Sequence, residues 1–189
     1  MKATLKLPEN YEEIDRIDLE KNKKQMILVN VLSIVLAVLV FIPMLILAPE
    51  GASFPREGLD VVILLAGMFG YIILHEAVHG VCFWGFSRQK PRFGWKSAYA
   101  YAASDAYYAK GPYLVIGLAP VVLWGVVLAV LAAVLPVRWY SIVQLIQLIN
   151  LSGAAGDLYV TWLLCRMPKD ILVQDAGVAM QVYAPEQDE

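Results

Sequence analysis

The sequence predicts an all-α membrane protein with four transmembrane helices. A small β element is predicted in the loop between the second and third spans, on the cytoplasmic side. Of the 189 residues, 59% are hydrophobic and 17% are charged, whereas soluble domains carry about 25% charged residues. The apolar residues gather in long runs, which is typical of membrane spans and not of a single soluble core. A soluble helical bundle is the alternative, but four charge-poor runs of this length are unusual in that class.

Each run is long enough to cross a bilayer, which takes about 20 apolar residues. The predicted spans are 26–48, 61–86, 113–135 and 139–165. The first and third spans are uncharged, and each contains one proline, Pro43 or Pro120, which transmembrane helices tolerate. The second and fourth spans each contain one acidic residue, Glu76 and Asp157 respectively.

Basic residues predict the orientation of the spans. Of the 15 lysines and arginines, all but two fall in the N-terminal tail 1–25, in the loop between the second and third spans, or at the C-terminal end around the tail 167–189. The two other connections carry one each, Arg56 and Arg138. Cytoplasmic flanks of membrane spans are rich in Lys and Arg, so both termini and the long loop are predicted to be cytoplasmic.

The composition also excludes some classes of protein. A net charge of −2 without a basic patch argues against nucleic-acid binding. Cys82 and Cys165 both lie in apolar segments and form no disulfide framework. The polar and charged N-terminal segment is not expected to be a cleavable signal peptide.

Both histidines lie in one pentapeptide of the second span, His75-Glu76-Ala77-Val78-His79. Residues four apart share one face of a helix, so both imidazoles can reach one metal ion with Glu76 beside them. A lone buried histidine is usually a hydrogen-bonded core residue. A histidine pair that brackets a glutamate inside a membrane span is poorly explained in that way, and we interpret it as part of a metal site.

Asp157 is the preferred third ligand. A carboxylate inside a span is costly, which makes it a candidate functional residue. His79 lies nine residues before Arg88, and Asp157 lies nine residues before Arg166. At about 1.5 Å per residue, each is about 13–14 Å from its cytoplasmic basic flank, so the two share one depth. A catalytic zinc commonly takes two histidines and one carboxylate and keeps a position open for water.

Two other residues are considered as ligands. Cys82, three residues after His79, is the alternative to Asp157, although it can equally be a small buried core residue. Asp105 falls in a loop and is better interpreted as a solvated turn residue. Zinc lowers the pKa of a bound water, and Glu76 would take its proton and deliver it to a leaving amine. The same ligands also suit iron or cobalt.

The loop between the second and third spans shows a strand pattern at residues 93–103. Large side chains recur there with period two, and Ser104-Asp105 can turn the chain back along 106–109. They are Phe93, Trp95, Tyr99 and Tyr101. A free strand edge beside a hydrolytic site can bind an unfolded segment as an added strand. Equally, the aromatic residues can form a belt at the bilayer interface.

The segment Asn150-Leu-Ser-Gly-Ala-Ala-Gly-Asp157 is rich in small residues, which let helix backbones approach closely in lipid. Asn150 lies seven residues before Asp157 and therefore on nearly the same face. Together with Gln144 and Gln147, it is also suited to hydrogen bonds between helices.

These motifs resemble the site-2 protease class of intramembrane zinc metalloproteases, with H-E-A-V-H in one span and an Asp after small residues in a later one. The whole chain more closely resembles a compact bacterial family of zincin peptidases of unknown function. It shares with that family the Lys-rich tail, HEAVHG, the Phe-Gly-Trp-Lys loop, Leu-Ala-Pro in the third span, and the fourth-span segment.

The resemblance implies His75, His79 and Asp157 as zinc ligands, Glu76 as the catalytic base, and Asn150 as a group that assists the substrate carbonyl or oxyanion. Site-2 proteases usually have prolines between the Asn and the Asp, and a Gly after the Asp. Here the interval holds glycines and alanines, and Leu158 follows.

The leading hypothesis is therefore Zn²⁺-dependent hydrolysis of a peptide bond in a membrane protein segment, in the bacterial cytoplasmic membrane. The expected partners are the lipid bilayer and a membrane protein or peptide substrate. One alternative is a non-catalytic zinc-bearing scaffold or chaperone, although such sites usually have four protein ligands and need no spare acid. Another is a small metal or proton transporter that uses Glu76 and Asp157, although four spans without repeat symmetry offer little machinery for alternating access.

Overall fold

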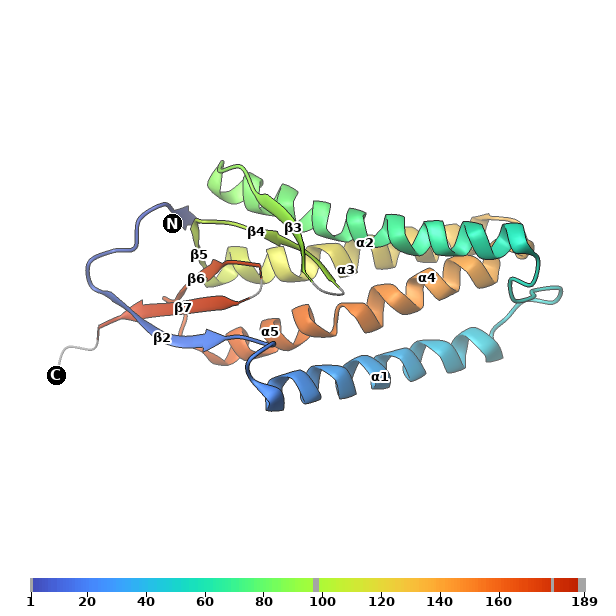
Figure 1. Ribbon diagram of the computed structural model, residues 1–189, viewed down its shortest axis with the longest axis horizontal. Helices are drawn as coiled ribbons and strands as arrows, with labels where there is room; N and C mark the ends of the chain where they lie inside the picture. Colours follow the sequence, from blue (N-terminus) through green and yellow to red (C-terminus); the bar gives the residue numbers. More distant parts are fainter. Residues whose placement is uncertain (1, 97–98, 178, 187–189) are drawn as a thin grey trace. The chain divides into compact units, whose positions relative to one another are not determined.

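The computed structural model describes residues 2–96, 99–177 and 179–186. Five α-helices and one 3-10 helix form in this part of the chain (Figure 1). They are α1 (Lys23–Ile46), α2 (Gly58–Ser87), α3 (Lys110–Val134), η1 (Val137–Trp139), α4 (Tyr140–Gly153) and α5 (Ala155–Arg166).

Four helical stretches are long and apolar enough to cross a membrane. Three are the single helices α1, α2 and α3, and the fourth is Val137–Arg166, which combines η1, α4 and α5. These stretches agree with the four predicted spans to within a few residues. None of the most apolar window of α1 is buried inside the protein, as expected for a helix whose side chains face lipid.

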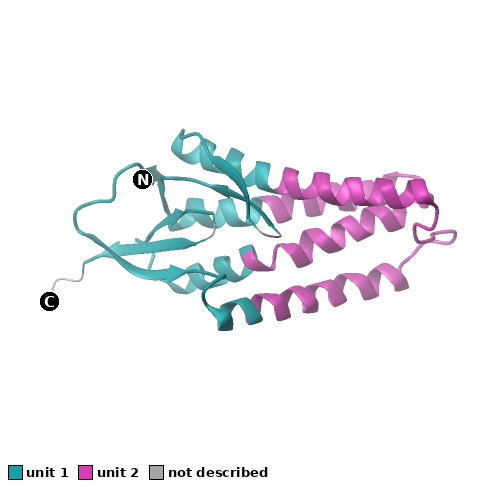
Figure 2. Ribbon diagram, viewed as in Figure 1, with its two compact units in different colours: residues 1–27, 76–119, 157–189 teal, residues 28–75, 120–156 magenta. Residues whose placement is uncertain are grey.

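The chain divides into two compact units, coloured separately in Figure 2. Unit 2 comprises residues 28–75 and 120–156 and is helical throughout its regular structure. Its helices α2 and α4 approach closely at Gly67, where a Cβ atom would lie 2.9 Å from Cδ1 of Ile146. Small residues at such points let helix backbones come together.

Unit 1 comprises residues 1–27, 76–119 and 157–189 and contains every strand found in the described residues. Five strands form an antiparallel sheet in the order β1-β5-β6-β7-β2. They are β1 (Ala3–Thr4), β2 (Tyr11–Ile17), β5 (Tyr107–Ala109), β6 (Leu172–Asp175) and β7 (Met180–Pro185). The core of unit 1 joins this sheet to α2, α3 and α5 through fully buried side chains such as Tyr108, Val173, Phe83, Ile116 and Leu164.

The predicted all-α fold class is wrong, because the segments 1–25 and 167–189 supply four strands of this sheet, β1, β2, β6 and β7. In β2 the apolar residues Tyr11, Ile14 and Ile17 recur every three positions, which does not resemble a strand. The register with β7 shifts between Glu13 and Asp15, and a bulge of this kind breaks the two-residue alternation. The partner strand also lies at the other end of the chain, so local sequence does not reveal the pairing.

The β element predicted at 93–103 is present, but as two antiparallel strands and not one. Strands β3 (Arg92–Lys96) and β4 (Tyr99–Ala103) form a two-stranded sheet in which Gly94 pairs with Tyr101. Figure 1 shows this hairpin beside the second half of α2. The return segment predicted at 106–109 contains β5, which belongs to the larger sheet.

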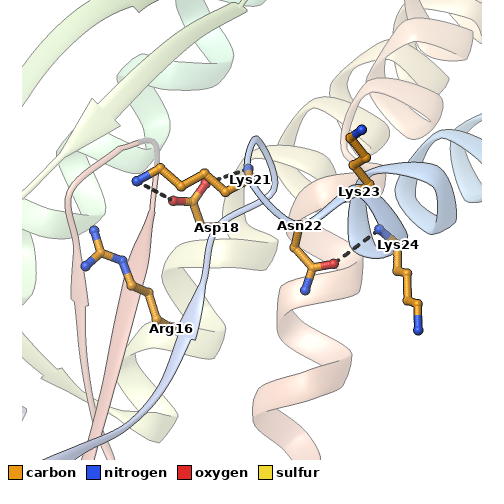
Figure 3. Close-up of a pocket in the computed structure, with 6 residues that line it drawn as sticks. All are labelled: Arg16, Asp18, Lys21, Asn22, Lys23 and Lys24. Carbon is orange, nitrogen blue, oxygen red and sulfur yellow. Dashed lines mark hydrogen bonds and ion pairs between the residues drawn. The ribbon is translucent and has the colours of Figure 1, made fainter.

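The start of α1 is a capped helix end. Asn22 Oδ1 accepts the backbone N–H groups of Lys24 and Gln25, at 3.2 Å each, and thereby satisfies donors of the first turn. The open pocket beside it is drawn in Figure 3 and is lined by Arg16, Asp18, Lys21, Asn22, Lys23 and Lys24. Lys23 and Lys24 point in opposite directions there, so the cations do not converge on a ligand. We interpret this pocket as the basic flank of the first span.

Candidate metal centre

His75 and His79 lie one turn apart on α2, and both are buried. The Nδ1 atom of His79 lies 3.0 Å from the backbone oxygen of Ile116 on α3. A carbonyl can only accept, so Nδ1 carries a hydrogen, and in the neutral form of the ring the lone pair is on Nε2. Donation from one ring nitrogen to a backbone carbonyl is common in metal-binding histidines, in which the other nitrogen binds the metal.

Asp157 stands in the first turn of α5, directly after a break in the fourth helical stretch. The break falls at Ala154, where ψ is 10° and the helix hydrogen bonding of α4 ends. Asp157 Oδ2 lies 3.7 Å from His79 Nε2. A carboxylate in the first turn of a helix is favourably placed with respect to the helix dipole.

His75, His79 and Asp157 each offer one ligand atom, and these three atoms all lie within 4.8 Å of one another. In the described residues this is the one group of His, Cys, Asp or Glu side chains found that could hold a metal ion. Two ligands bound tetrahedrally at about 2.0 Å from one zinc ion are separated by roughly 3.3 Å. The separation of 3.7 Å between His79 and Asp157 is close to that value. The donor set therefore fits a three-ligand zinc site.

His75 is held by a hydrogen-bonded chain. Its Nδ1 lies 2.8 Å from the Tyr71 hydroxyl, which in turn donates to Asn150 Oδ1 at 2.8 Å. With its own hydrogen directed at Asn150, the hydroxyl accepts from Nδ1 of His75, and Nε2 is again the nitrogen with a lone pair. Sequence reasoning missed Tyr71, although its position four residues before His75 places it on the same face of α2.

Asn150 is fully buried and makes several hydrogen bonds. Besides accepting from Tyr71, its amide nitrogen donates to the backbone oxygen of Val121 at 3.2 Å and to Gln147 Oε1 at 3.4 Å. These contacts place Asn150 within the hydrogen-bond network of His75. Its predicted role toward a substrate carbonyl stays a prediction.

Glu76 contacts the β3–β4 hairpin. Its Oε2 accepts the backbone N–H of Ala102 on β4 at 2.8 Å. The hairpin reaches α2 one turn further on, where the Phe93 ring fills the space above Gly80 so closely that a methyl group at this glycine would overlap it. This contact gives a physical reason for the glycine that ends the HEAVHG segment.

A buried acid near the hairpin, Asp175, was not predicted. Asp175, at the end of β6, accepts hydrogen bonds from the Tyr113 hydroxyl and from the Gly177 N–H, the latter at 2.8 Å. Its backbone oxygen accepts the Ser104 N–H at 2.9 Å. Burial raises the pKa of Asp175 above its usual value, although these side-chain hydrogen bonds oppose the shift. Asp175 lies in a segment that we predicted to be a tail, so nothing in the sequence singled it out.

The two other acidic or thiol candidates lie elsewhere. Cys82 is partly buried against the hydrophobic core of unit 1 and does not belong to the three-residue group. Asp105 is exposed and pairs with Arg92, with 2.6 Å between Oδ1 and the guanidinium nitrogen. The exposure of Asp105 agrees with its interpretation as a solvated residue.

Two histidines one helical turn apart on a helix, with a glutamate directly after the first, are typical of the zincin class of metallopeptidases, in which a carboxylate can be the third zinc ligand. The chain belongs to the family described as "Putative zincin peptidase", which it matches over residues 68–172. That range contains both histidines, Glu76 and Asp157. The family assigns the chain to the zinc metalloproteases and confirms the predicted family and the Zn²⁺ cofactor. No curated protein and no solved structure matches the chain.

Proposed function

We propose that this protein is a membrane-embedded zinc peptidase that cleaves a peptide bond in a segment of a membrane protein. The observation that carries the proposal is the group His75, His79 and Asp157, whose members all lie on helical stretches apolar enough to cross a membrane. A hydrolytic site at that position would meet substrates that are themselves in the membrane.

In this proposal His75 and His79 would hold the ion through their Nε2 atoms, and Asp157 would hold it through a carboxylate oxygen. Zinc, when bound, supplies an activated water and polarises the carbonyl of the scissile bond. Glu76 is the general base, whose carboxylate takes up a proton during the attack and returns it to the leaving nitrogen. Asn150 and Tyr71 act through His75 by fixing the orientation of its ring.

We further propose that the site lies in the cytoplasmic half of the bacterial cytoplasmic membrane, with both chain termini cytoplasmic. The support is the distribution of basic residues, which are enriched on the cytoplasmic side of membrane spans. Arg88 follows His79 by nine residues, and Arg166 follows Asp157 by nine residues. This placement resembles that of the site-2 protease class.

The outer edge of β4 is a candidate substrate-binding edge. In the described residues, β4 pairs only with β3. The backbone groups on its other edge lie on the side of Glu76, since Ala102 donates to that residue. An extended substrate segment can add to such an edge through main-chain hydrogen bonds. The aromatic side chains of β3 are compatible with an interfacial belt as well, since Phe93 and Trp95 are both more than half exposed.

The experiment compares membrane-protein fragments in cells that express the wild-type protein or Glu76→Gln. The proposal predicts at least one fragment that is present with the wild-type protein and absent with the variant. Identical fragment patterns in the two strains would instead favour a non-catalytic zinc-bearing scaffold. Metal flux into liposomes that depends on Asp157 would favour a transporter.

A further inference from the structure

Strand β4 contacts the acid of the metal centre through its backbone. We infer that β4 is a positioning element, which fixes the Glu76 carboxylate through the Ala102 N–H and is itself held in place by Tyr101, Gly177 and Asp175. This inference rests on the proposed function, because it gives Glu76 its role as the base. It adds residues of two separate strands to the machinery of the site.

The direction of the Ala102 N–H follows from the pairing of the hairpin. In an antiparallel pair, successive residues of one strand point their N–H groups alternately toward and away from the partner strand. Ala102 donates to Glu76 and therefore points away from β3. By the same alternation, the N–H of Ala100 also points away from β3, while Tyr101 is hydrogen-bonded to Gly94 across the hairpin.

The side chain of Tyr101 is enclosed by two glycines. A methyl group at Gly94, its partner on β3, would overlap the end of the Tyr101 ring. A methyl group at Gly177, in the turn between β6 and β7, would overlap another edge of the same ring. Gly177 also has a φ of +86°, which disfavours any residue with a side chain. The Tyr101 ring therefore fits only because both positions lack a side chain.

Asp175 holds the Gly177 turn to the end of β4. Its side chain accepts the Gly177 N–H at 2.8 Å, and its backbone oxygen accepts the N–H of Ser104, the residue that follows β4, at 2.9 Å. A buried, hydrogen-bonded carboxylate of this kind restricts the local backbone. Besides the chain connection from β4 to β5, the five-stranded sheet thus contacts the hairpin through the Tyr101 ring and the Ser104 N–H.

The consequence for Glu76 is a fixed carboxylate. A glutamate side chain has several rotamers, and a catalytic base is effective only within a narrow range of positions. A backbone N–H that donates to a carboxylate makes a charge-assisted hydrogen bond, which is among the stronger kinds in proteins. The Ala102 N–H occupies one oxygen of the carboxylate and so restricts where the other oxygen can lie.

The experiment measures ligand binding and needs no peptide substrate. The purified protein is loaded with Co²⁺, whose absorption spectrum reports ligands that enter the metal's coordination sphere. Two probes are titrated: acetohydroxamate, which is bound by the metal and also hydrogen-bonds to a neighbouring carboxylate, and azide, which needs only the metal. The ratio of their affinities reports the position of Glu76 separately from the metal site.

Ala102→Pro removes the N–H that Glu76 accepts and leaves the pairing with β3 intact, since that N–H points away from β3. We expect acetohydroxamate affinity to fall about tenfold, the effect of losing one charge-assisted hydrogen bond, with azide affinity unchanged. The matched control is Ala100→Pro, which places the same residue on the same edge, two positions from the Glu76 contact, and should leave both affinities at wild-type values. Equal acetohydroxamate affinity in Ala102→Pro and wild type would overturn the inference.

A second pair of variants tests the connection to the sheet, and serves also if Ala102→Pro does not fold. Gly177→Ala should lower the affinity for acetohydroxamate several-fold and leave the affinity for azide unchanged. This effect should be smaller in a Tyr101→Ala background, where the enclosed ring is absent. Equal effects of Gly177→Ala in both backgrounds would exclude Tyr101 as the connection. Failure of the proposed function would give a different result. Either the His75→Ala and His79→Ala variants would bind Co²⁺ as tightly as the wild-type protein does, or the Co²⁺-loaded wild-type protein would bind neither acetohydroxamate nor azide.

Discussion

Asp157 Oδ2 lies 3.7 Å from His79 Nε2, although the two residues come from different helices, α5 and α2. Two structural features lead to this distance. The fourth helical stretch is interrupted at Ala154, so Asp157 stands in a first helical turn. Helices α3 and α5 also approach closely, since a Cβ atom on Gly117 would lie 3.1 Å from Thr161 Oγ1. The carboxylate thereby reaches the face of α2 that carries the histidine pair.

Glu76→Gln should separate metal binding from catalysis. The amide keeps the size of the side chain and is not one of the three proposed ligands, so zinc content should stay at the wild-type level. It cannot take up a proton as a carboxylate does, and general acid–base catalysis typically contributes 100-fold or more. Cleavage of a substrate found by the fragment comparison should therefore fall by at least about 100-fold. Loss of zinc together with activity would show that Glu76 acts on the metal site itself.

Tyr71→Phe should weaken zinc binding without removing a ligand. The substitution deletes the hydroxyl that joins His75 Nδ1 to Asn150, and loss of such an outer partner typically costs 10–100-fold in metal affinity. Zinc affinity is measured by competition with a chelator. Tyr140→Phe is the control, because its hydroxyl donates to the Met44 backbone oxygen at 3.3 Å, away from the histidines. Equal affinities for the two variants would show that Tyr71 does not position His75.

Ala100→Pro should abolish peptide cleavage if β4 binds substrate along its outer edge. Proline lacks the N–H that an added strand would use, and at this position no hydrogen bond to β3 is lost. The zinc content and the affinity for the small probe acetohydroxamate should remain normal and thereby show that the site is intact. Undiminished cleavage by this variant would rule out strand addition at β4 and favour the interfacial-belt interpretation.

Acidification should release the end of the hairpin. Hydrogen bonds from Lys96 and then Tyr99 lower the pKa of Glu20, whose carboxylate oxygens lie 2.6 Å from Lys96 Nζ and 2.8 Å from the Tyr99 hydroxyl. An acid with a lowered pKa in the folded state stabilises it above the unfolded pKa, about 4.3 for Glu. That contribution is lost as the pH falls through the lowered value.

Hydrogen exchange of the hairpin amides measures this effect. After correction for intrinsic rates, protection of residues 92–96 and 99–103 should be constant from pH 7 to pH 5 and should decrease below about pH 4. Glu20→Gln should show the weaker protection already at pH 7, with little further change on acidification. Identical pH profiles for the two proteins would show that the contacts of Glu20 with Lys96 and Tyr99 do not stabilise the end of the hairpin.

The helical part of the fold could be predicted because each span is encoded by its own local hydrophobicity. The uncharged run around Pro43 needs no partner to be recognised, and the same holds for the run around Pro120. The sheet could not be predicted in this way, since β2 pairs with β7 from the other end of the chain and the shift at Glu13/Asp15 hides its alternation. Short strands that pair over such distances carry little signal in any one segment.

In the candidate site, too, some residues could be predicted from local sequence and others depend on pairing between distant segments. His75, Glu76 and His79 follow from one helical pentapeptide, and Asp157 follows from its depth relative to basic residues that flank the spans. Asp175 could not be found, because it reaches the hairpin only after β6 has paired within the sheet. The backbone N–H of Ala102 could not be found either, since sequence motifs report side chains and not the direction of a strand edge.

Zinc content of the purified protein tests the central assignment most directly. Metal analysis of the wild-type protein should give about one zinc per chain, as expected for a single three-ligand site, and Glu76→Gln should give the same value. Asp157→Ala should lose the zinc, because it removes the carboxylate beside His79, whereas Asp105→Ala, which changes an exposed acid, should retain it. Full zinc retention in Asp157→Ala would contradict the account.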